Sequence, residues 1–155
     1  MPVNTIQPRG FGVAWVTLCV GFVLHIVDEA LTDILSVYNP TVLALRAQMR
    51  WLPLPTFSLK SWLAVMVLVN VALLLLSPYA FRGARWMRPL AYGFAGIMIL
   101  NAIGHVLGTI AGQTFASVRF SRPMSGFYSS PFLLGAAIYL LSRLRRTKES
   151  DARAV

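Results

Sequence analysis

Residues 25–33 read HIVDEALTD and bring together side chains that can bind a metal or transfer a proton. The chain has five acidic residues, and Asp28, Glu29 and Asp33 lie in this stretch together with His25, one of two histidines. Imidazole and carboxylate groups are common ligands of zinc and iron, and they also act as general acids and bases. The stretch is therefore the first candidate for a site.

The spacing of these residues predicts that they share one face of a helix. His25, Asp28, Glu29 and Thr32 follow the pattern i, i+3, i+4, i+7, and Asp33 lies at the edge of that face. Charged groups cost about 2.5–3.5 kcal/mol each at the centre of a membrane helix on insertion scales, so they usually mark function there. We expect this polar face to point into a helix bundle.

The second histidine lies in a similar setting. Asn101 and His105 are an i, i+4 pair in a later apolar run. At about 1.5 Å per residue, both histidines lie roughly 23 Å from the starts of their runs, so they reach the same depth if the runs enter from the same side. Glycines 104, 108 and 112 follow a GxxxGxxxG pattern, which predicts a close approach of a neighbouring backbone. We expect His25, Asp28, Glu29 and His105 to meet.

The composition identifies the elements that must hold these residues. The 155-residue chain is 57% apolar and 12% charged, whereas soluble domains carry about 25% charged residues. Four apolar runs, about 11–37, 59–81, 89–112 and 126–142, are near the length that crosses a bilayer. The sequence predicts one all-α integral membrane domain over residues 1–155, a four-span bundle with a basic polar tail at 143–155. Asn39-Pro40 is expected to end the first helix.

A short amphipathic helix is expected between the first two spans. Residues 41–55 alternate apolar and basic positions at helical spacing, and Pro53 and Pro55 would end that helix. This pattern is typical of a helix that lies in the membrane interface, and it equally fits a helix that packs over the mouth of the bundle as a lid; the sequence does not separate the two.

The basic residues predict the orientation and explain the net charge of +9. With four spans, nine basic residues lie on the side of both termini and five on the other, which favours both termini in the cytoplasm, in a membrane of the bacterial cytoplasmic type. Topology and lipid headgroups account for this charge, so no nucleic-acid partner is expected. The lone Cys19 excludes an intramolecular disulfide.

Three arrangements would offset the free-energy cost of burying the polar cluster in a membrane. A divalent metal, zinc or iron, could be bound by His25, Glu29 and His105. A proton relay could use Asp28 and Glu29 as catalytic groups. The groups could also neutralise one another and only fix the helix register. Four further residues are candidates for substrate binding or for support of the cluster: Thr32, Asp33, Asn101 and Tyr128.

The motif His25-Ile-Val-Asp28-Glu29 resembles that of the HXXEE-domain family of small membrane proteins, with aspartate in place of the first glutamate. The later NAIGH stretch, with Asn101 and His105, looks like that family's second polar signature. FYSSP at 127–131 looks like a loose version of its Tyr-and-Pro element. The resemblance covers about residues 11–142 and supports the site without naming a reaction.

These observations lead to one functional expectation and two alternatives. The expectation is a membrane enzyme that acts on a lipid-like or hydrophobic molecule through the His/Asp/Glu cluster. The alternatives are a small proton-coupled multidrug-type transporter and a non-catalytic assembly or ligand-binding subunit. A transporter site usually lies at the membrane midplane, whereas this cluster is expected nearer the outer surface. The expected partners are membrane lipids, a hydrophobic small molecule and, in an oligomer, further copies of the chain.

Overall fold

The computed structural model describes residues 8–51 and 53–152, and the side chains of residues 9–51 and 53–145. The described chain is helical and holds no β-strand, apart from an isolated bridge between Gln113 and Arg119. This confirms the all-α prediction. The helices are α1 (Pro8–Leu31), α2 (Leu35–Gln48), α3 (Leu59–Leu75), α4 (Ser77–Phe81), α5 (Met87–Ala111) and α6 (Ser130–Ala152).

Three segments are long and apolar enough to cross a membrane: Arg9–Leu31, Leu59–Phe81 and Met87–Ala111. They correspond to three of the four predicted spans and are consistent with an integral membrane protein. Among the described residues, α6 is not one of these segments, because its second half is basic. Arg143 lies 13 positions after Ser130, so the apolar part of α6 is only about 20 Å long.

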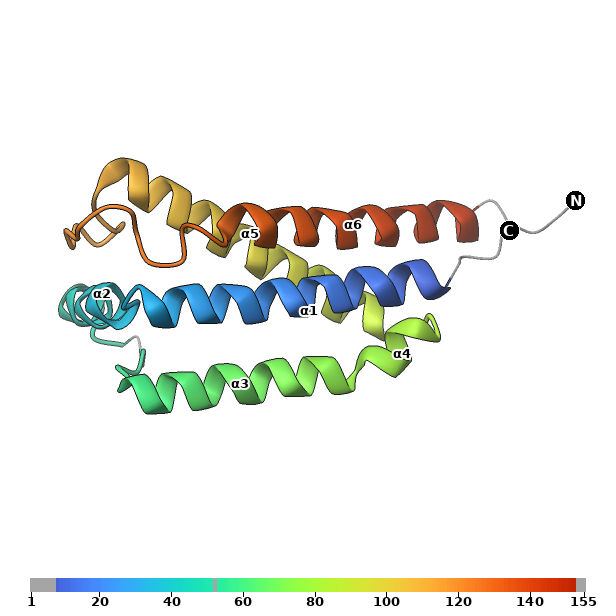
Figure 1. Cartoon of the computed structure of the whole chain (residues 1–155), viewed down its shortest axis with the longest axis horizontal. Helices are drawn as coiled ribbons and strands as arrows, with labels where there is room; N and C mark the ends of the chain where they lie inside the picture. Colours follow the sequence, from blue (N-terminus) through green and yellow to red (C-terminus); the bar gives the residue numbers. More distant parts are fainter. Residues whose placement is uncertain (1–7, 52, 153–155) are drawn as a thin grey trace, which may run out of the picture.

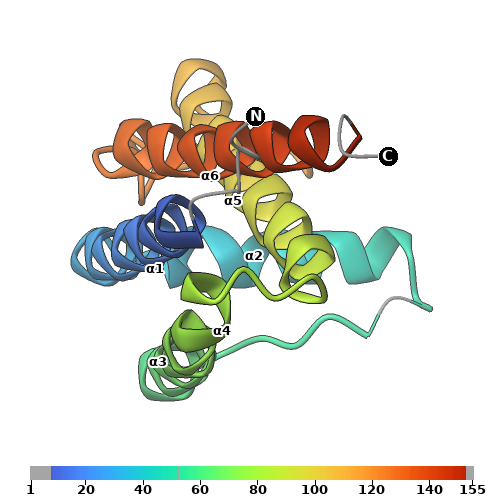
Figure 2. The ribbon, with the colours of Figure 1, turned by 90° about the vertical axis from the view of Figure 1, so that its right-hand side faces the viewer.

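The long helices run back and forth along one axis (Figure 1). In that view α1, α3 and α6 lie roughly along the long axis, and α5 crosses them obliquely. The direction reverses from α1 to α3, from α3 to α5 and from α5 to α6. Helix α2 is seen end-on in Figure 1 and lengthwise in Figure 2, so it lies across the end of the bundle where α1 ends.

The end of the first helix differs from the prediction. Helix α1 ends at Leu31, not near residue 37, and Pro40 lies inside α2 instead of stopping a helix. Asp33 adopts the left-handed conformation with φ of 54°, and the amide of Ile34 donates to the carbonyl of Glu29 at 3.0 Å. This is a Schellman-type helix end, in which aspartate is tolerated because its short polar side chain suits the left-handed region.

The last helix also has other bounds than predicted. Residues 126–129 form a turn, so the helix begins at Ser130, four residues later than the predicted span. Residues 143–152, predicted as a polar tail, continue the helix to Ala152, and 153–155 lie outside the described residues. Arginine and lysine are good helix formers, so nothing in this basic sequence stops the helix.

The central helix of the bundle is α1, which packs against α3, α4 and α6. Its buried side chains include Trp15, whose indole donates to the carbonyl of Leu73 in α3 at 3.0 Å. The ring of Phe94 in α5 packs edge-on against Trp15 and Phe22, with centroids 5.5 and 6.0 Å away. Helix α5 otherwise packs mainly against α6. Helices α1 and α5, which carry the predicted polar residues, thus both pack on α6.

Helix α2 is tethered to the segment before α3. The side-chain amide of Asn39 donates to the carbonyl of Phe57 at 2.9 Å and accepts from its amide at 3.0 Å. The hydroxyl of Tyr38 donates to the carbonyl of Pro55 at 3.0 Å. The helix predicted within 41–55 is therefore only partly correct, because α2 begins at Leu35 and ends at Gln48, so neither Pro53 nor Pro55 ends it.

Candidate metal centre

Three buried side chains converge between α1 and α5. The Oε1 atom of Glu29 lies 3.4 Å from Nε2 of His25 and 3.2 Å from Nε2 of His105. The exposed fractions of these residues are 8%, 0% and 4%. One ligand atom from each residue lies within 4.8 Å of those from the other two, a spacing that could hold a metal ion.

The two helices place this cluster by their periodicity. His25 and Glu29 are one turn apart on α1, and Asn101 and His105 are one turn apart on α5. The side chains interleave, because Asn101 contacts His25 at 3.1 Å while His105 contacts Glu29. The imidazole rings meet edge to face with centroids 4.8 Å apart. The predicted convergence of both histidines with Glu29 is confirmed.

The expected role of the glycine ladder on α5 is wrong. A Cβ on Gly104 would meet no atom within 4 Å, and one on Gly108 would meet the side chain of Met124. Gly112 ends α5 in the left-handed conformation, with φ of 71°. The ladder therefore does not bring a helix backbone close, and α5 approaches the cluster through side chains instead.

Asp28 reaches the N-terminus of α6 and not the histidines. Its Oδ2 accepts hydrogen bonds from the backbone amide and from the hydroxyl of Ser129, each at 2.8 Å. Ser129 directly precedes α6, where free amide groups and the helix dipole favour a negative charge. These donors explain how a half-buried carboxylate is accommodated at this depth.

Ser129 connects Asp28 to His25 and fixes the protonation of the ring. The Ser129 hydroxyl lies 2.8 Å from Nδ1 of His25, and its one proton is donated to Asp28. With Asp28 ionised and accepting this proton, Nδ1 of His25 carries the hydrogen that it shares with Ser129. The lone pair of neutral His25 is then at Nε2, which faces Glu29 and accepts from the amide of Asn101.

This hydrogen-bond pattern leaves Glu29 facing one donor and one acceptor. His105 can donate its Nε2 hydrogen to Glu29, but neutral His25 presents a lone pair to the same carboxylate oxygen. Because that lone pair accepts from Asn101 at 3.1 Å, a direct bond between His25 and Glu29 would take a proton on Nε2 or a cation shared by the two side chains. With the Nε2 hydrogen placed toward Glu29, Nδ1 of buried His105 has no hydrogen-bond partner among the described residues.

A loop residue closes the cluster. Gly126 has φ of 81°, and a Cβ there would lie 2.8 Å from Cε1 of His105 and 2.9 Å from Cε1 of His25. The glycine thus lets the loop backbone contact both imidazole rings. The loop is fastened to α1 by Ser125, which donates to the carbonyl of Glu29 at 3.2 Å, and by Thr32, which lies 2.7 Å from the Ser125 hydroxyl.

The other predicted site residues fall into two groups. Thr32 and Asn101 support the cluster, one through the loop and the other through His25. Asp33 is exposed and forms the left-handed turn that ends α1. Tyr128 is 68% exposed, and its ring packs edge-on against Phe127. The structure therefore does not bring Asp33 and Tyr128 to the cluster.

Sequence reasoning missed the functional part of the last loop. Ser125, Gly126 and Ser129 contact the cluster, whereas the sequence pointed to their neighbour Tyr128. The signal for Ser129 was present, because serine before Ser130-Pro131 is a strong helix-start pattern. A helix start at the depth of Asp28 implies free amides near that carboxylate.

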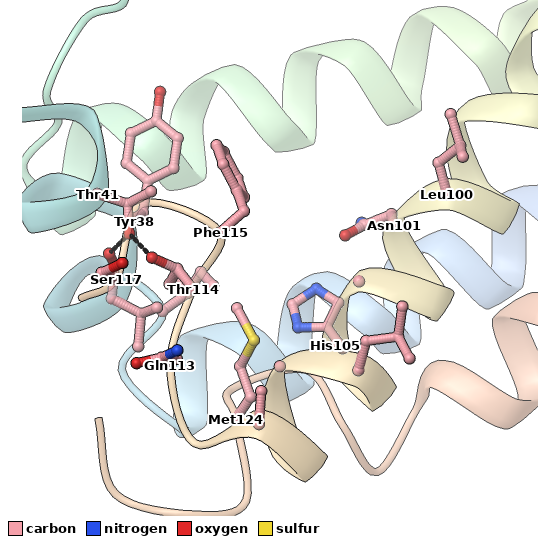
Figure 3. A pocket seen from close by; sticks show the side chains of 16 residues that line it. Tyr38, Thr41, Leu100, Asn101, His105, Gln113, Thr114, Phe115, Ser117 and Met124 are labelled. Atoms are coloured by element: carbon pink, nitrogen blue, oxygen red, sulfur yellow. Dashed lines mark hydrogen bonds between the residues drawn. The ribbon is translucent and has the colours of Figure 1, made fainter. Parts of the chain in front are cut away.

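A cavity of about 670 Å³ lies on one side of the cluster (Figure 3). Its walls come from α2, from the second half of α5 and from the loop that follows α5. His105 and Asn101 line it, whereas His25 and Glu29 do not. A molecule in the cavity would therefore approach the cluster from the side of His105.

The chain was compared with family models, curated proteins and solved structures, and none matches it. The chemistry of the cluster is therefore inferred from its geometry alone. Two imidazoles and one carboxylate can bind a metal ion, and the serine and aspartate behind His25 are of the kind that orient a metal-binding histidine.

Gly126→Ala tests whether the loop backbone must contact both rings. A left-handed alanine costs about 1–2 kcal/mol, and the added methyl would also displace the two imidazoles. Gly83→Ala is the control, because Gly83 has a similar φ of 67° in the turn between α4 and α5. We expect a clearly larger loss of unfolding free energy in detergent for Gly126→Ala. Equal losses would show that the contact with the rings is unimportant.

Proposed function

We propose that the chain is a membrane enzyme that acts on a lipid-like molecule at a divalent metal, zinc or iron, bound by His25, Glu29 and His105. The observation that carries the proposal is the convergence of three buried ligand groups from two helices. Ionisable groups inside a membrane protein usually serve function, because their burial is costly. The resemblance to the HXXEE-domain family agrees with this proposal and stays a prediction.

The two distances from Glu29 to the histidines suit zinc, and the ligand atoms of the cluster all lie within 4.8 Å of one another. Ligand atoms that bind zinc tetrahedrally at about 2.0–2.2 Å lie about 3.3–3.6 Å from one another. The two contacts of Glu29 measure 3.4 and 3.2 Å, close to that spacing. A metal would also resolve the conflict between the lone pair of His25 and the carboxylate, because it takes both as ligands. Asn101 would then have to release Nε2 of His25.

The donor set is typical of catalytic metal sites. Two histidines and one glutamate hold zinc in several hydrolases, and a two-histidine, one-carboxylate set holds iron in oxygenases. Structural zinc sites usually have four protein ligands, so three leave a position for water or substrate. A metal held in this way supplies Lewis acidity toward a bound group.

The chain's own residues then have separate roles. The metal would be bound by His25, Glu29 and His105. Asp28 acts through Ser129 to hold His25 in the tautomer that presents Nε2 to the metal. We therefore assign Asp28 as a positioning residue, whereas the sequence suggested a catalytic carboxylate. Glu29 is the acid at the centre, within reach of both imidazoles.

We also propose a four-span topology with α6 as the last span and α2 in the outer interface. Helix α6 packs along α1 and α5 with Leu133, Ala137 and Leu140 buried, although its apolar part is short. Long arginine and lysine side chains can reach the interface from within a helix end, which lets a short apolar stretch cross.

A reporter fused after Val155 tests this topology. Nine of the 14 basic residues lie on the side of the two termini, which favours the cytoplasm for both ends. We expect a cytoplasmic reporter to be active and a periplasmic reporter to be silent. The reverse result would mean that α6 does not cross, or that the whole bundle is inverted.

Metal analysis of the detergent-purified protein, prepared without chelators, tests the metal centre. We expect about one zinc or iron per wild-type chain, and background levels for His105→Ala and Glu29→Gln. Asp33→Asn is the matched control, since it also replaces an acid by its amide near the end of α1 but outside the cluster. Added metal should raise the melting temperature of the wild type and control only, because a ligand at 100 times its Kd stabilises by about 2.7 kcal/mol.

The outcomes of this experiment separate the three arrangements. A metal-free wild type that gains no thermal stability from added zinc or iron would contradict the metal centre. If activity were then lost in Glu29→Gln without loss of fold, the cluster would be a proton relay. If both variants only lowered the melting temperature, it would be structural.

Ser129→Ala tests the positioning role of Asp28 and Ser129. Loss of the hydroxyl leaves Nδ1 of His25 without its partner, and changes of this kind behind a metal ligand weaken binding by about 10–100-fold. Ser142→Ala is the control, because this hydroxyl only donates to the carbonyl of Tyr139 on the surface of α6. Metal titration should show weaker binding for Ser129→Ala alone. Equal metal affinities of the two variants would show that Ser129 does not position His25.

A further inference from the structure

The cavity beside His105 has two polar ends and an apolar middle. One end holds His105 and Asn101, and the other holds hydroxyl groups from α2 and the loop, including Thr41 and Thr114. Figure 3 shows these two groups apart from each other, with the side chains of Phe115 and Met124 between them. This arrangement suits an elongated molecule that is polar at its ends and apolar between them.

The lining carries no formal charge. Among the described residues that line the cavity there is no aspartate, glutamate, lysine or arginine. Burial raises the pKa of Tyr38, and the nearby charge of Arg46 opposes this only in part, so the phenol stays neutral at physiological pH. Away from the end at His105, a charged group would lose its hydration without gaining an ion pair from the described lining residues, which is costly. We therefore expect the cavity to take uncharged lipids in preference to fatty acids and phosphorylated lipids, whose charged groups find no partner outside the end at His105.

The polar groups at the far end are suited to hydroxyl or ester oxygens. The Thr41 hydroxyl donates to the carbonyl of Val37 at 2.6 Å. The hydroxyl oxygen of Thr114 lies 3.3 Å from the hydroxyl oxygen of Thr41. A threonine hydroxyl has one proton and two lone pairs, so both residues keep capacity for a further hydrogen bond. An uncharged ligand with hydroxyl groups could use that capacity.

The position of the cavity allows entry from the membrane. Leu100, Leu107 and Phe115 line it and are 72%, 58% and 85% exposed, so its wall continues onto the apolar surface of α5 and the loop. Its volume of about 670 Å³ lies within the roughly 300–1,000 Å³ range of pockets that take one small molecule. The buried Nδ1 of His105, which has no partner among the described residues, lies in a side chain that borders this space.

We propose that this cavity binds an uncharged single-chain lipid with a hydroxyl or ester group at each end, of the ω-hydroxy fatty acid ester type, and presents it to the metal centre. The proposal rests on the proposed function for the reaction site, whereas binding depends only on the cavity. His105 and Asn101 face the reacting end of the lipid. The hydroxyl-lined end between α2 and the loop holds its other polar group.

Photolabelling with two matched probes tests the proposal. The uncharged probe is the methyl ester of an ω-hydroxy fatty acid with a diazirine in its chain, and the anionic probe is the free ω-hydroxy fatty acid with the same chain, at a pH where it is ionised. We expect the uncharged probe to label the second half of α5 or the loop at 113–124, at least tenfold more than the anionic probe. Mass spectrometry of the labelled peptides locates the label.

Gly104→Leu and Gly96→Leu form the matched pair for this experiment. Both glycines lie on α5 with no atom within 4 Å of an added Cβ, but only Gly104 lines the cavity. Gly104→Leu should fill the cavity and reduce labelling at least tenfold, while Gly96→Leu should label like the wild type. Equal labelling by both probes, or labelling that persists in Gly104→Leu, would overturn the proposal.

The metal content of the same samples separates this proposal from the proposed function. Loss of labelling in Gly104→Leu with the metal retained supports the cavity as a separate binding site. Labelling as expected in a protein without metal would support the lipid site and contradict the metal centre. Metal present with no selective labelling would contradict the lipid site alone.

Discussion

Two imidazoles and a carboxylate are buried together in an otherwise apolar helix bundle, and this costs free energy unless each polar atom has a partner. Glu29 lies between His25 and His105, with 8% of its surface exposed. Removing one partner from a buried ionic group commonly costs several kcal/mol. The positions of α1, α5 and the loop before α6 can be understood as the means of supplying these partners.

The support comes from parts of the chain that are distant in sequence. The start of α6 gives Asp28 a backbone amide and a hydroxyl, and the same hydroxyl fixes the ring of His25. The loop contributes Gly126, whose missing side chain leaves room for both rings. A histidine held through its second nitrogen is oriented to use its first, which is the usual arrangement in metal sites. The cluster therefore has support on the side of His25 and an open side at His105.

The sequence predicted the helices and the central cluster well, because both depend on local periodicity. His25 and Glu29 share a face in an α-helix, and equal distances from the predicted helix starts placed His105 at the same level as His25. The helix end at Asp33 was missed, because a non-glycine residue in the left-handed region leaves little trace in sequence. The role of Ser129 was missed because it depends on how α6 docks against α1, which no local pattern encodes.

The glycines of α5 show the same limit. A GxxxGxxxG pattern predicts a close helix contact, yet Gly104 borders a cavity and Gly112 ends the helix. The pattern does not tell which role each glycine has, because glycine occurs equally at close helix contacts, at helix ends and beside cavities. Gly126, which no pattern singled out, makes the contact with the imidazoles.

The central claim is that His25, Glu29 and His105 bind one metal ion together, and X-ray absorption at the metal edge of the purified wild-type protein tests it most directly. For the zinc form, the account predicts two imidazole nitrogens at about 2.0–2.1 Å and at least one carboxylate oxygen at about 2.0–2.2 Å. A protein without bound metal, or a metal whose coordination sphere holds no imidazole, would contradict it.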